Sequence, residues 1–246
     1  MAIKVAACQV PDIREDVESA LRWIEKFSQE AEENGADIIC FPECFLQGYL
    51  TDEILAREYA IDISSDRFNI ILKKLSGFKP MLVFGLIEKD NNSLFNTAVV
   101  VKDGQLLGKY RKTHLLDGEL LFTSGNLYPI FEVKNIKFGV NICYDTQFPE
   151  AVAEVAKQGA SLILCPSNNM MKRKTAEKYK FFHHQIRTKR AIESGMWIVS
   201  SDVTGSREDR IAYGPTSAIS PKGDVVTQVP LMQVGIIFVE INLTEI

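Results

Sequence analysis

Three side chains in this sequence have the chemistry and the placement that an enzyme site needs. Glu43 follows an apolar run at 37–42, where a carboxylate can take up and return protons. Lys112 lies in a basic segment after a predicted hairpin, where an ammonium can oppose a developing negative charge or carry a proton. Cys143 ends an apolar run at 136–143, and its thiol becomes a nucleophile when it is ionised.

Each of these residues also has a plain structural interpretation. An acid after a strand can be solvated, and the basic segment 109–114 can be a charged surface. Cys143 can be an inert core thiol, since Cys8, Cys40 and Cys165 also lie near the ends of apolar runs. No single segment decides between the catalytic and the structural interpretation.

The elements that must position these residues are those of an α/β fold, because short apolar runs alternate with amphipathic stretches. We expect helices at 17–34, 66–75, 149–158 and 175–194. We expect strands at 3–9, 37–42, 81–87, 95–102, 105–110, 136–143, 161–166, 196–202 and 235–242, with a strand pair around 221–224. Ligands of open α/β sheets bind at the carboxyl ends of strands, where Glu43 and Cys143 would lie. No linker or repeat interrupts the pattern, so we expect one domain over 1–246.

The composition excludes several classes of protein. The chain is 46% hydrophobic and 24% charged, with a net charge of −4, which leaves no electrostatic footprint for nucleic acid or an anionic membrane. The apolar stretch at 2–10 is too short, and the residues after it too acidic, for a signal peptide or a membrane span. Its five cysteines are an odd number, and most lie in apolar runs, as reduced thiols do. We therefore expect a cytoplasmic protein.

Taken together, the three segments resemble the nitrilase superfamily of carbon–nitrogen hydrolases, in its amidase and N-carbamoyl hydrolase-like branch. The chain has F-P-E ending at Glu43, Y-R-K-T-H-L around Lys112, and I-C-Y-D around Cys143 followed by a second F-P-E. The motifs stand in the family's order, and supporting matches extend over nearly the whole chain. The resemblance implies a four-layer α-β-β-α sandwich with two mixed sheets inside and helices outside.

The resemblance also implies a mechanism. Cys143 would be the nucleophile, Glu43 the general base and later acid, and Lys112 the group that stabilises the tetrahedral intermediate. Glu119 would match a second glutamate that orients Lys112 and the substrate, although it could also be a surface acid. The implied activity is hydrolysis of a small amide or N-carbamoyl compound through a Cys thioester, with release of ammonia. It needs no metal and no organic cofactor.

The residues around the nucleophile bear on the substrate. Tyr144 after the cysteine is typical of the amidase branches, and many of those have Arg where this chain has Gln147. We expect Tyr144 and Asn168 to contact the substrate. Lys172 or Arg173 would pair with a carboxylate on an amino-acid-like substrate, unless this loop is merely solvated.

Other activities stay open at this point. The same residues would serve an acyltransferase or an N-carbamoyl-amino-acid hydrolase. A Cys–His enzyme would use Cys143 with His114, His183 or His184, but neighbouring helical residues such as His183 and His184 point about 100° apart. A third possibility is an interaction protein that kept the fold without the activity, in which case Cys143 should not react with an electrophile.

The expected partners are a small amide substrate and a second copy of the chain, with no nucleic acid and no membrane. Members of this family pair through one helical face. The predicted helix at 175–194 and the C-terminal tail are our candidates for the interface of a homodimer or a higher homo-oligomer.

Overall fold

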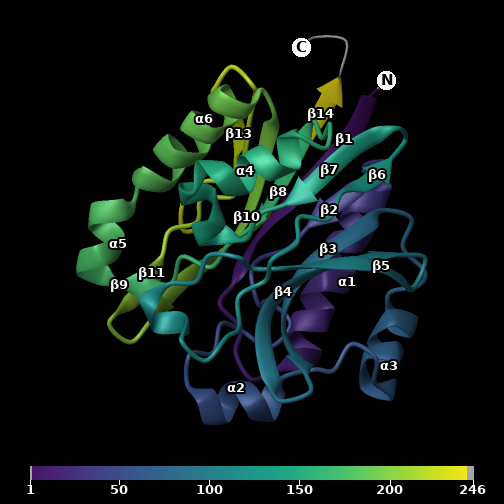
Figure 1. The fold of residues 1–246 in the computed structure, drawn as a ribbon, viewed down its shortest axis with the longest axis vertical. Coiled ribbons are helices and arrows are strands. Elements are labelled where there is room, and N and C mark those ends of the chain that lie inside the picture. Colours follow the sequence, from purple (N-terminus) through teal and green to yellow (C-terminus); the bar gives the residue numbers. More distant parts are fainter. Residues whose placement is uncertain (1, 243–246) are drawn as a thin grey trace.

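The computed structural model describes residues 2–242 and arranges them in four layers, with two β-sheets packed face to face between helices (Figure 1). The first sheet has the order β5-β4-β3-β2-β1-β14. Neighbouring strands from β1 to β3 are parallel, and the others are antiparallel. The strands are β1 (Ala2–Pro11), β2 (Ile38–Cys40), β3 (Met81–Asp90), β4 (Ser93–Lys102), β5 (Gln105–Arg111) and β14 (Gly235–Asn242).

The second sheet has the order β6-β7-β8-β10-β12-β13. Its strands are β6 (Phe131–Val133), β7 (Ile136–Val140), β8 (Leu162–Pro166), β10 (Trp197–Arg207), β12 (Ser217–Ile219) and β13 (Val225–Gln228). Two short strands, β9 (Met171–Lys172) and β11 (Arg210–Ala212), continue from the far end of β10. The two sheets are joined where Gln9 to Pro11 of β1 pair in parallel with Asp202 to Thr204 of β10.

Alternating side chains of β1 explain how its sheet becomes buried on both faces. Val5 and its alternate neighbours pack between the two sheets, in an apolar cluster that also contains Phe138 of β7. Cys8 and its alternate neighbours face the helices α1 (Val17–Glu33) and α3 (Asp66–Lys74).

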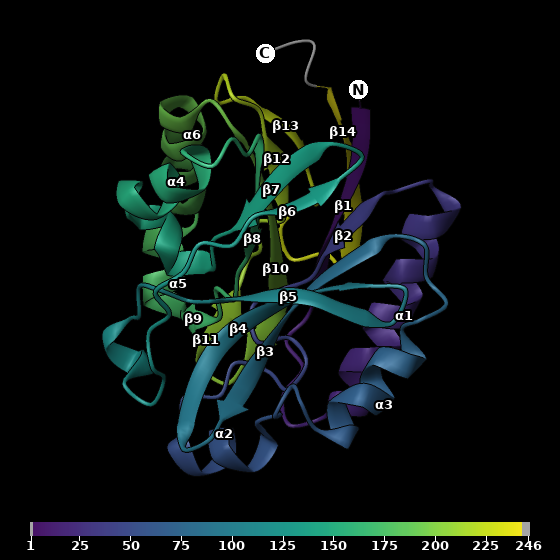
Figure 2. The same ribbon diagram turned by 45° about the vertical axis from the view of Figure 1, so that its right-hand side comes forward.

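The second sheet is covered in the same way by α4 (Pro149–Ala156) and α6 (Phe182–Ser194), on the opposite side of the molecule (Figure 2). The predicted four-layer α-β-β-α sandwich is therefore confirmed.

Short elements that the apolar periodicity did not predict lie around the ends of the strands. These are α2 (Glu53–Tyr59), α5 (Arg173–Tyr179), the 3₁₀ turns η1 (Asp117–Glu119) and η2 (Cys143–Gln147), and the strands β6, β9 and β11. The helix α2 buries only Ala56, so it carries no apolar stripe that a sequence pattern could reveal.

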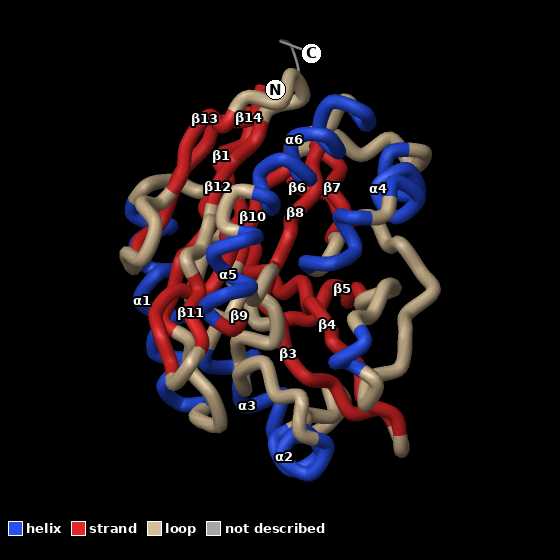
Figure 3. Tube along the Cα trace, turned by 90° about the vertical axis from the view of Figure 1, so that its left-hand side faces the viewer, coloured by secondary structure: helices blue, strands red, loops and turns tan. Residues whose placement is uncertain are grey.

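The prediction of one continuous helix at 175–194 was wrong. The chain forms α5 and α6 with a break at Lys180–Phe181, although no Gly or Pro marks it. The two helices pack on different partners: α5 lies beside β9 and β11, whereas α6 packs on α4, β10 and β12 (Figure 3). Tertiary packing therefore overrides the local helical preference. No helix in the described part of the chain has the length and apolarity to cross a membrane.

Candidate active site

The candidate site lies where strands of both sheets end. Glu43 follows β2 and Lys112 follows β5 in the first sheet, whereas Cys143 follows β7 in the second. Asn168 and Asn169 follow β8, next to β7. Side chains far apart in the sequence therefore converge at one edge of the sandwich, as ligand-binding residues do in α/β sheets.

A buried ion cluster forms one side of this site. The Lys112 ammonium donates to Glu43 Oε1 at 2.8 Å and to Glu119 Oε1 at 2.9 Å. The side-chain amide of Asn96, in the middle of β4, donates to the same two oxygens at 2.7 and 3.1 Å. All four residues are at most 1% exposed, so the two acids and the single cation hold one another in a fixed geometry away from bulk water.

The remaining carboxylate oxygens of this cluster accept backbone hydrogen bonds. Asn168 N–H donates to Glu43 Oε2 at 2.9 Å, and Leu116 N–H donates to Glu119 Oε2 at 2.8 Å. The main chain of Asn168 therefore positions Glu43. This hydrogen bond links the loop after β8 in the second sheet to Glu43 in the first sheet.

Burial acts in opposite directions on the pKa values of Glu43 and Lys112. Burial raises the pKa of Glu43 above its ordinary value; Lys112 opposes the rise and Glu119 adds to it. Burial alone would lower the pKa of Lys112, but the charges of Glu43 and Glu119 outweigh it, and the Lys112 pKa lies above its ordinary value. Lys112 therefore stays an ammonium, whereas Glu43 can accept a proton more easily than a solvated glutamate.

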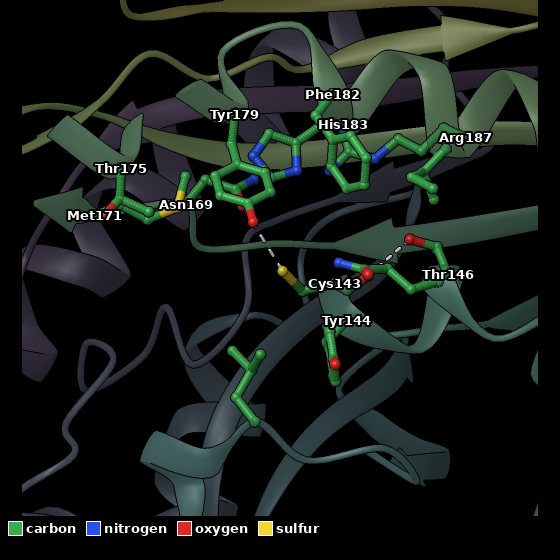
Figure 4. A pocket seen from close by; sticks show the side chains of 13 residues that line it. Cys143, Tyr144, Thr146, Asn169, Met171, Thr175, Tyr179, Phe182, His183 and Arg187 are labelled. Atoms are coloured by element: carbon green, nitrogen blue, oxygen red, sulfur yellow. Dashed lines mark hydrogen bonds between the residues drawn. The ribbon is translucent and has the colours of Figure 1, made fainter. Parts of the chain in front are cut away.

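Cys143 stands at the start of η2 in a strained conformation. Its φ is +43°, in the left-handed region that residues with a side chain rarely adopt. The half-buried thiol faces Asn169 Oδ1 at 3.9 Å (Figure 4). Burial and the charge of Glu43 raise the thiol pKa, and Lys112 only partly offsets them. The resting Cys143 is therefore a thiol, which needs a base to become a nucleophile.

Behind Asn169 lies a second buried acid, Asp202 of β10. Asn169 donates to it from its backbone N–H at 3.0 Å and from its side-chain amide. Burial raises the pKa of Asp202 to about 7, against the opposing charge of Arg187. The motifs gave no sign of Asp202, Arg187 or Asn96, because each lies inside an ordinary strand or helix pattern.

The thiol opens onto a pocket of about 400 Å³, which we call the catalytic pocket. Its wall comes from η2, the loop after β8, α5 and α6, and its lining includes Tyr144, Tyr179 and Phe182 (Figure 4). A pocket of this volume, lined mainly by uncharged side chains, suits a small organic molecule.

The carboxylate of Asp145 fastens the two catalytic segments to each other. It accepts from Tyr110 OH at 2.8 Å, from the backbone N–H of His114 at 2.8 Å, and from the backbone N–H of Ile142 at 2.9 Å. The segment after β5 and the turn that carries Cys143 are therefore bound to one buried anion. Asp145 acts in this arrangement as a structural support.

A glycine of β3, Gly85, packs closely against the turn that carries Glu43. Gly85 in β3 exchanges backbone hydrogen bonds with Pro42 and Leu46, which flank the turn of Glu43. A Cβ on Gly85 would lie 2.3 Å from the backbone N of Cys44 and 2.5 Å from Pro42 O. Only glycine allows the strand to approach the turn this closely.

The histidines do not form a catalytic pair with Cys143. His114 stacks on Phe148, with ring centroids 3.8 Å apart, and its Nδ1 lies 3.2 Å from Asp145 Oδ1. Burial, helped by Arg187, lowers the pKa of His183 to about 3. Within residues 2–242 no hydrogen bond joins a histidine to the Cys143 thiol, and no group of three or more potential metal ligands occurs.

The predicted site residues fall into two groups. The structure brings together Glu43, Lys112, Glu119 and Cys143, with Tyr144 in the pocket wall and Asn168 on Glu43, as described above. Lys172 and Arg173 are exposed instead, and neither lines the catalytic pocket. Met171 before them and Thr175 after them do line this pocket, so the segment borders it while these two side chains stay outside. Their role in substrate binding stays a prediction.

Comparisons with known proteins agree with this geometry. The sequence profile of the family "Carbon-nitrogen hydrolase" matches residues 4–246. A nitrilase from Pyrococcus abyssi is 30% identical over 98% of this chain and 90% of its own. The omega-amidase NIT2 of Xenopus tropicalis is 31% identical over 82% of this chain and 76% of its own. The structure of Nit3 from Saccharomyces cerevisiae, a member of branch 10 of the nitrilase superfamily, superposes with a TM-score of 0.84 at 26% identity, covering 99% of this chain and 91% of Nit3. The chain is therefore an enzyme of the carbon–nitrogen hydrolase family, within the nitrilase superfamily.

Proposed function

We propose that this enzyme hydrolyses the C–N bond of a small linear amide through a thioester on Cys143. One observation carries the proposal: a single ammonium, Lys112, is held by two buried carboxylates close to the Cys143 thiol, which opens onto a pocket. This arrangement contains a base, an oxyanion partner and a nucleophile. It therefore has every group that acyl transfer needs.

In the acylation half, Glu43 takes the proton of the Cys143 thiol as Sγ attacks the amide carbonyl carbon. The negative charge that forms on the carbonyl oxygen is opposed by Lys112 and by backbone N–H groups after Cys143. The C–N bond then breaks, and Glu43 gives its proton to the nitrogen, which leaves as ammonia. The raised pKa of Glu43 suits a group that must both accept and donate this proton.

In the deacylation half, water replaces ammonia. Glu43 takes a proton from the water as its oxygen attacks the thioester, and Lys112 again opposes the oxyanion. The C–S bond breaks, the thiol regains its proton from Glu43, and a carboxylic acid leaves. Glu119 touches Lys112 directly and fixes the direction of its ammonium.

The amidases among the relatives support amides as substrates, while other relatives are named nitrilases. Among the amidases is the omega-amidase NIT2 of Xenopus tropicalis, and this chain has Tyr144 after the nucleophile. An N-carbamoyl amino acid would present the same carbonyl–nitrogen bond to Cys143. We therefore place the physiological substrate among linear amides first and N-carbamoyl compounds second.

Ammonia release tests this function directly. We expect turnover of at least one member of a panel of small amides and N-carbamoyl compounds, with no turnover by Cys143→Ala. Cys8→Ala is the matched control, because Cys8 is a fully buried thiol outside the site, and it should keep the activity. Acyl transfer to hydroxylamine without hydrolysis would instead favour an acyltransferase. No turnover and no reaction of Cys143 with iodoacetamide would contradict the proposal.

We also propose that the enzyme is a homodimer. The α5–α6 region exposes large apolar side chains, with Phe181 at the break 64% exposed and Ile192 near the end of α6 57% exposed. Apolar side chains on one helical layer are typical of a subunit interface. The last residues of the C-terminal tail, 243–246, lie outside the described residues. A monomer in light scattering at micromolar concentration would contradict this proposal.

A further inference from the structure

A second hollow, of about 340 Å³, adjoins the catalytic pocket. Leu116 and Met171 line both hollows, so the two cavities meet along these side chains. The second one is lined by three arginines, Arg14, Arg207 and Arg210, and we call it the arginine chamber. Neither the motifs nor the catalytic cluster accounts for these three residues.

The chamber has more guanidinium groups than carboxylates to pair with them. Arg207 is neutralised by Asp12, at 3.0 Å between Nε and Oδ2. Arg210 donates only to a backbone carbonyl, that of Met170 at 3.3 Å, and it has no ion pair within the described residues. Arg14 Nη2 lies 3.8 Å from Glu15 Oε1, but the Nε–H of Arg14 is buried without a hydrogen-bond partner. These donors are therefore free to bind an anion, for which guanidinium groups offer a planar pair of N–H bonds.

The backbone holds two of the arginines in positions where their like charges repel each other. Arg207 and Arg210 are direct cross-strand partners in the β10–β11 hairpin, and like charges opposite each other repel. Arg14 packs on Gly48, where a Cβ would lie 2.7 Å from Arg14 Cα. An anion between these groups would relieve the repulsion and satisfy the unpaired donor.

The inner wall of the chamber touches the catalytic acids. Asn168 lines the chamber, and its backbone N–H donates to Glu43. Tyr49 also lines it, and burial together with the charges of Glu43 and Glu119 raises the pKa of Tyr49. An anionic substrate would meet two catalytic carboxylates and one ammonium at the site. The arginines supply positive charge that offsets the repulsion between the anionic substrate and the two catalytic carboxylates.

We propose that the arginine chamber binds a carboxylate at the end of the substrate remote from the amide, so that the enzyme prefers amides of dicarboxylic acids over neutral amides. This inference rests on the proposed function, because it assumes that the amide reacts at Cys143. It assigns carboxylate recognition to Arg14 and Arg210 instead of the exposed Lys172 and Arg173.

The test compares two amides that differ mainly in charge. Succinamate carries a remote carboxylate, and levulinamide has a methyl ketone of similar size in its place. We expect the wild type to prefer succinamate, and Arg14→Gln and Arg210→Gln each to raise KM for succinamate about tenfold or more. The KM for levulinamide should change much less in the same variants. Arg210→Lys keeps the charge and should lose less affinity than Arg210→Gln. Arg67→Gln removes an exposed guanidinium on α3 and is the control that should match the wild type.

Three outcomes would overturn the proposal. The first is an equal rise of KM for both amides, which would indicate a structural role for the arginines. The second is a selective loss in Arg187→Gln but not in Arg210→Gln, which would place the anion in the catalytic pocket. The third is no preference for succinamate together with a change in levulinamide turnover on adding free succinate, which would indicate a separate anion site.

Direct binding separates this proposal from the proposed function. Calorimetry with succinate and the Cys143→Ala protein measures the chamber without any turnover. We expect binding that Arg210→Gln weakens by about tenfold. If no amide is hydrolysed but succinate still binds in this way, the reaction assigned above fails and the carboxylate site stands. If amides are hydrolysed but succinate does not bind, the carboxylate site fails.

Discussion

Arg111 and Lys112 are consecutive cations at the end of β5, and each belongs to a different buried ion cluster. Arg111 binds Glu88 through two hydrogen bonds, Nε to Oε2 at 2.9 Å and Nη2 to Oε1 at 2.6 Å. Lys112 binds Glu43 and Glu119 on the opposite side of the strand end. The two clusters are built from the same kinds of side chain.

The clusters differ in the number of cations that contact each buried acid, since Arg111 also binds Asp90, which is 46% exposed. Glu88 is 1% exposed and is contacted by Arg111, Lys109 and the hydroxyl of Thr97. Burial alone would raise the Glu88 pKa, but these contacts hold it below its ordinary value. In the other cluster one cation serves two acids, and the pKa of Glu43 is raised. Two cations on one buried acid hold its charge, whereas one cation shared by two buried acids leaves a proton that can move.

The largest expected effect is a loss of activity that distinguishes the two glutamates, Glu43 and Glu88. Glu43→Gln removes the base and should lower kcat/KM for the best amide about 10²–10⁴-fold, with the fold retained. Glu88→Gln should leave kcat/KM within a few-fold, but it should lower the free energy of unfolding by about 1–3 kcal/mol, because buried donors lose a charged acceptor. Ammonia release and urea unfolding of both variants measure the two effects. Equal losses of activity in the two variants would contradict the division of roles.

The next effect concerns the two cations. Lys112→Gln should lower kcat about 10²–10³-fold, because the oxyanion loses its charged partner. Arg111→Gln should instead reduce stability by about 1–3 kcal/mol and spare kcat, since Arg111 points to Glu88. Steady-state kinetics and thermal unfolding of the pair check this. If Arg111→Gln lost as much activity as Lys112→Gln, the adjacent cations would not be separate in function.

The pH dependence of stability should have opposite signs in the two clusters. The folded-state pKa of Glu88 is lowered, so its stabilising contribution is present above the ordinary glutamate pKa and is lost as pH falls through the lower value. The folded-state pKa of Glu43 is raised, so its contribution is present below the ordinary pKa and is lost as pH rises through the higher value. Urea unfolding of the wild type and both Gln variants at several pH values measures this.

The free energy of unfolding of Glu88→Gln should lie closest to that of the wild type at acidic pH. The free energy of unfolding of Glu43→Gln should rise relative to that of the wild type as the pH rises. Parallel curves for the two variants would show that the number of cations on each buried acid does not control its titration.

The smallest effect concerns Asp145, a buried acid that hydroxyl and backbone donors satisfy. Tyr110→Phe removes one of these donors and should lower the free energy of unfolding by about 1 kcal/mol. The activity should fall less than in Lys112→Gln, because the backbone donors of His114 and Ile142 still hold Asp145. Unfolding and kinetics together measure this, and a loss as large as that of Lys112→Gln would show that Tyr110 takes part in the chemistry.

Much of this site could be predicted from the sequence. Glu43, Lys112 and Cys143 stand in local motifs directly after apolar runs, so both their types and their places could be predicted. The four layers were implied by the family resemblance. Apolar periodicity predicted the elements themselves, as in β1, whose alternate side chains enter two different apolar clusters.

What could not be predicted depends on contacts between distant segments. Asn96 is an ordinary polar residue in the middle of a strand until Glu43 and Glu119 are placed beside it. The arginine chamber draws Arg14 and Arg210 from segments nearly two hundred residues apart. Lys172 and Arg173 lie close to the strand end in sequence, but both are exposed, whereas Met171 before them and Thr175 after them line the pocket.

Gly85 contributes no atom to the reaction, yet it limits how this sequence can diverge. Any side chain there would lie within 2.3 Å of the backbone beside Glu43, so even alanine would have to displace the turn that carries the base. In a library of all single substitutions, position 85 should tolerate as little change as position 143. Descendants of this enzyme can exchange the residues that select the substrate far more freely than this one glycine.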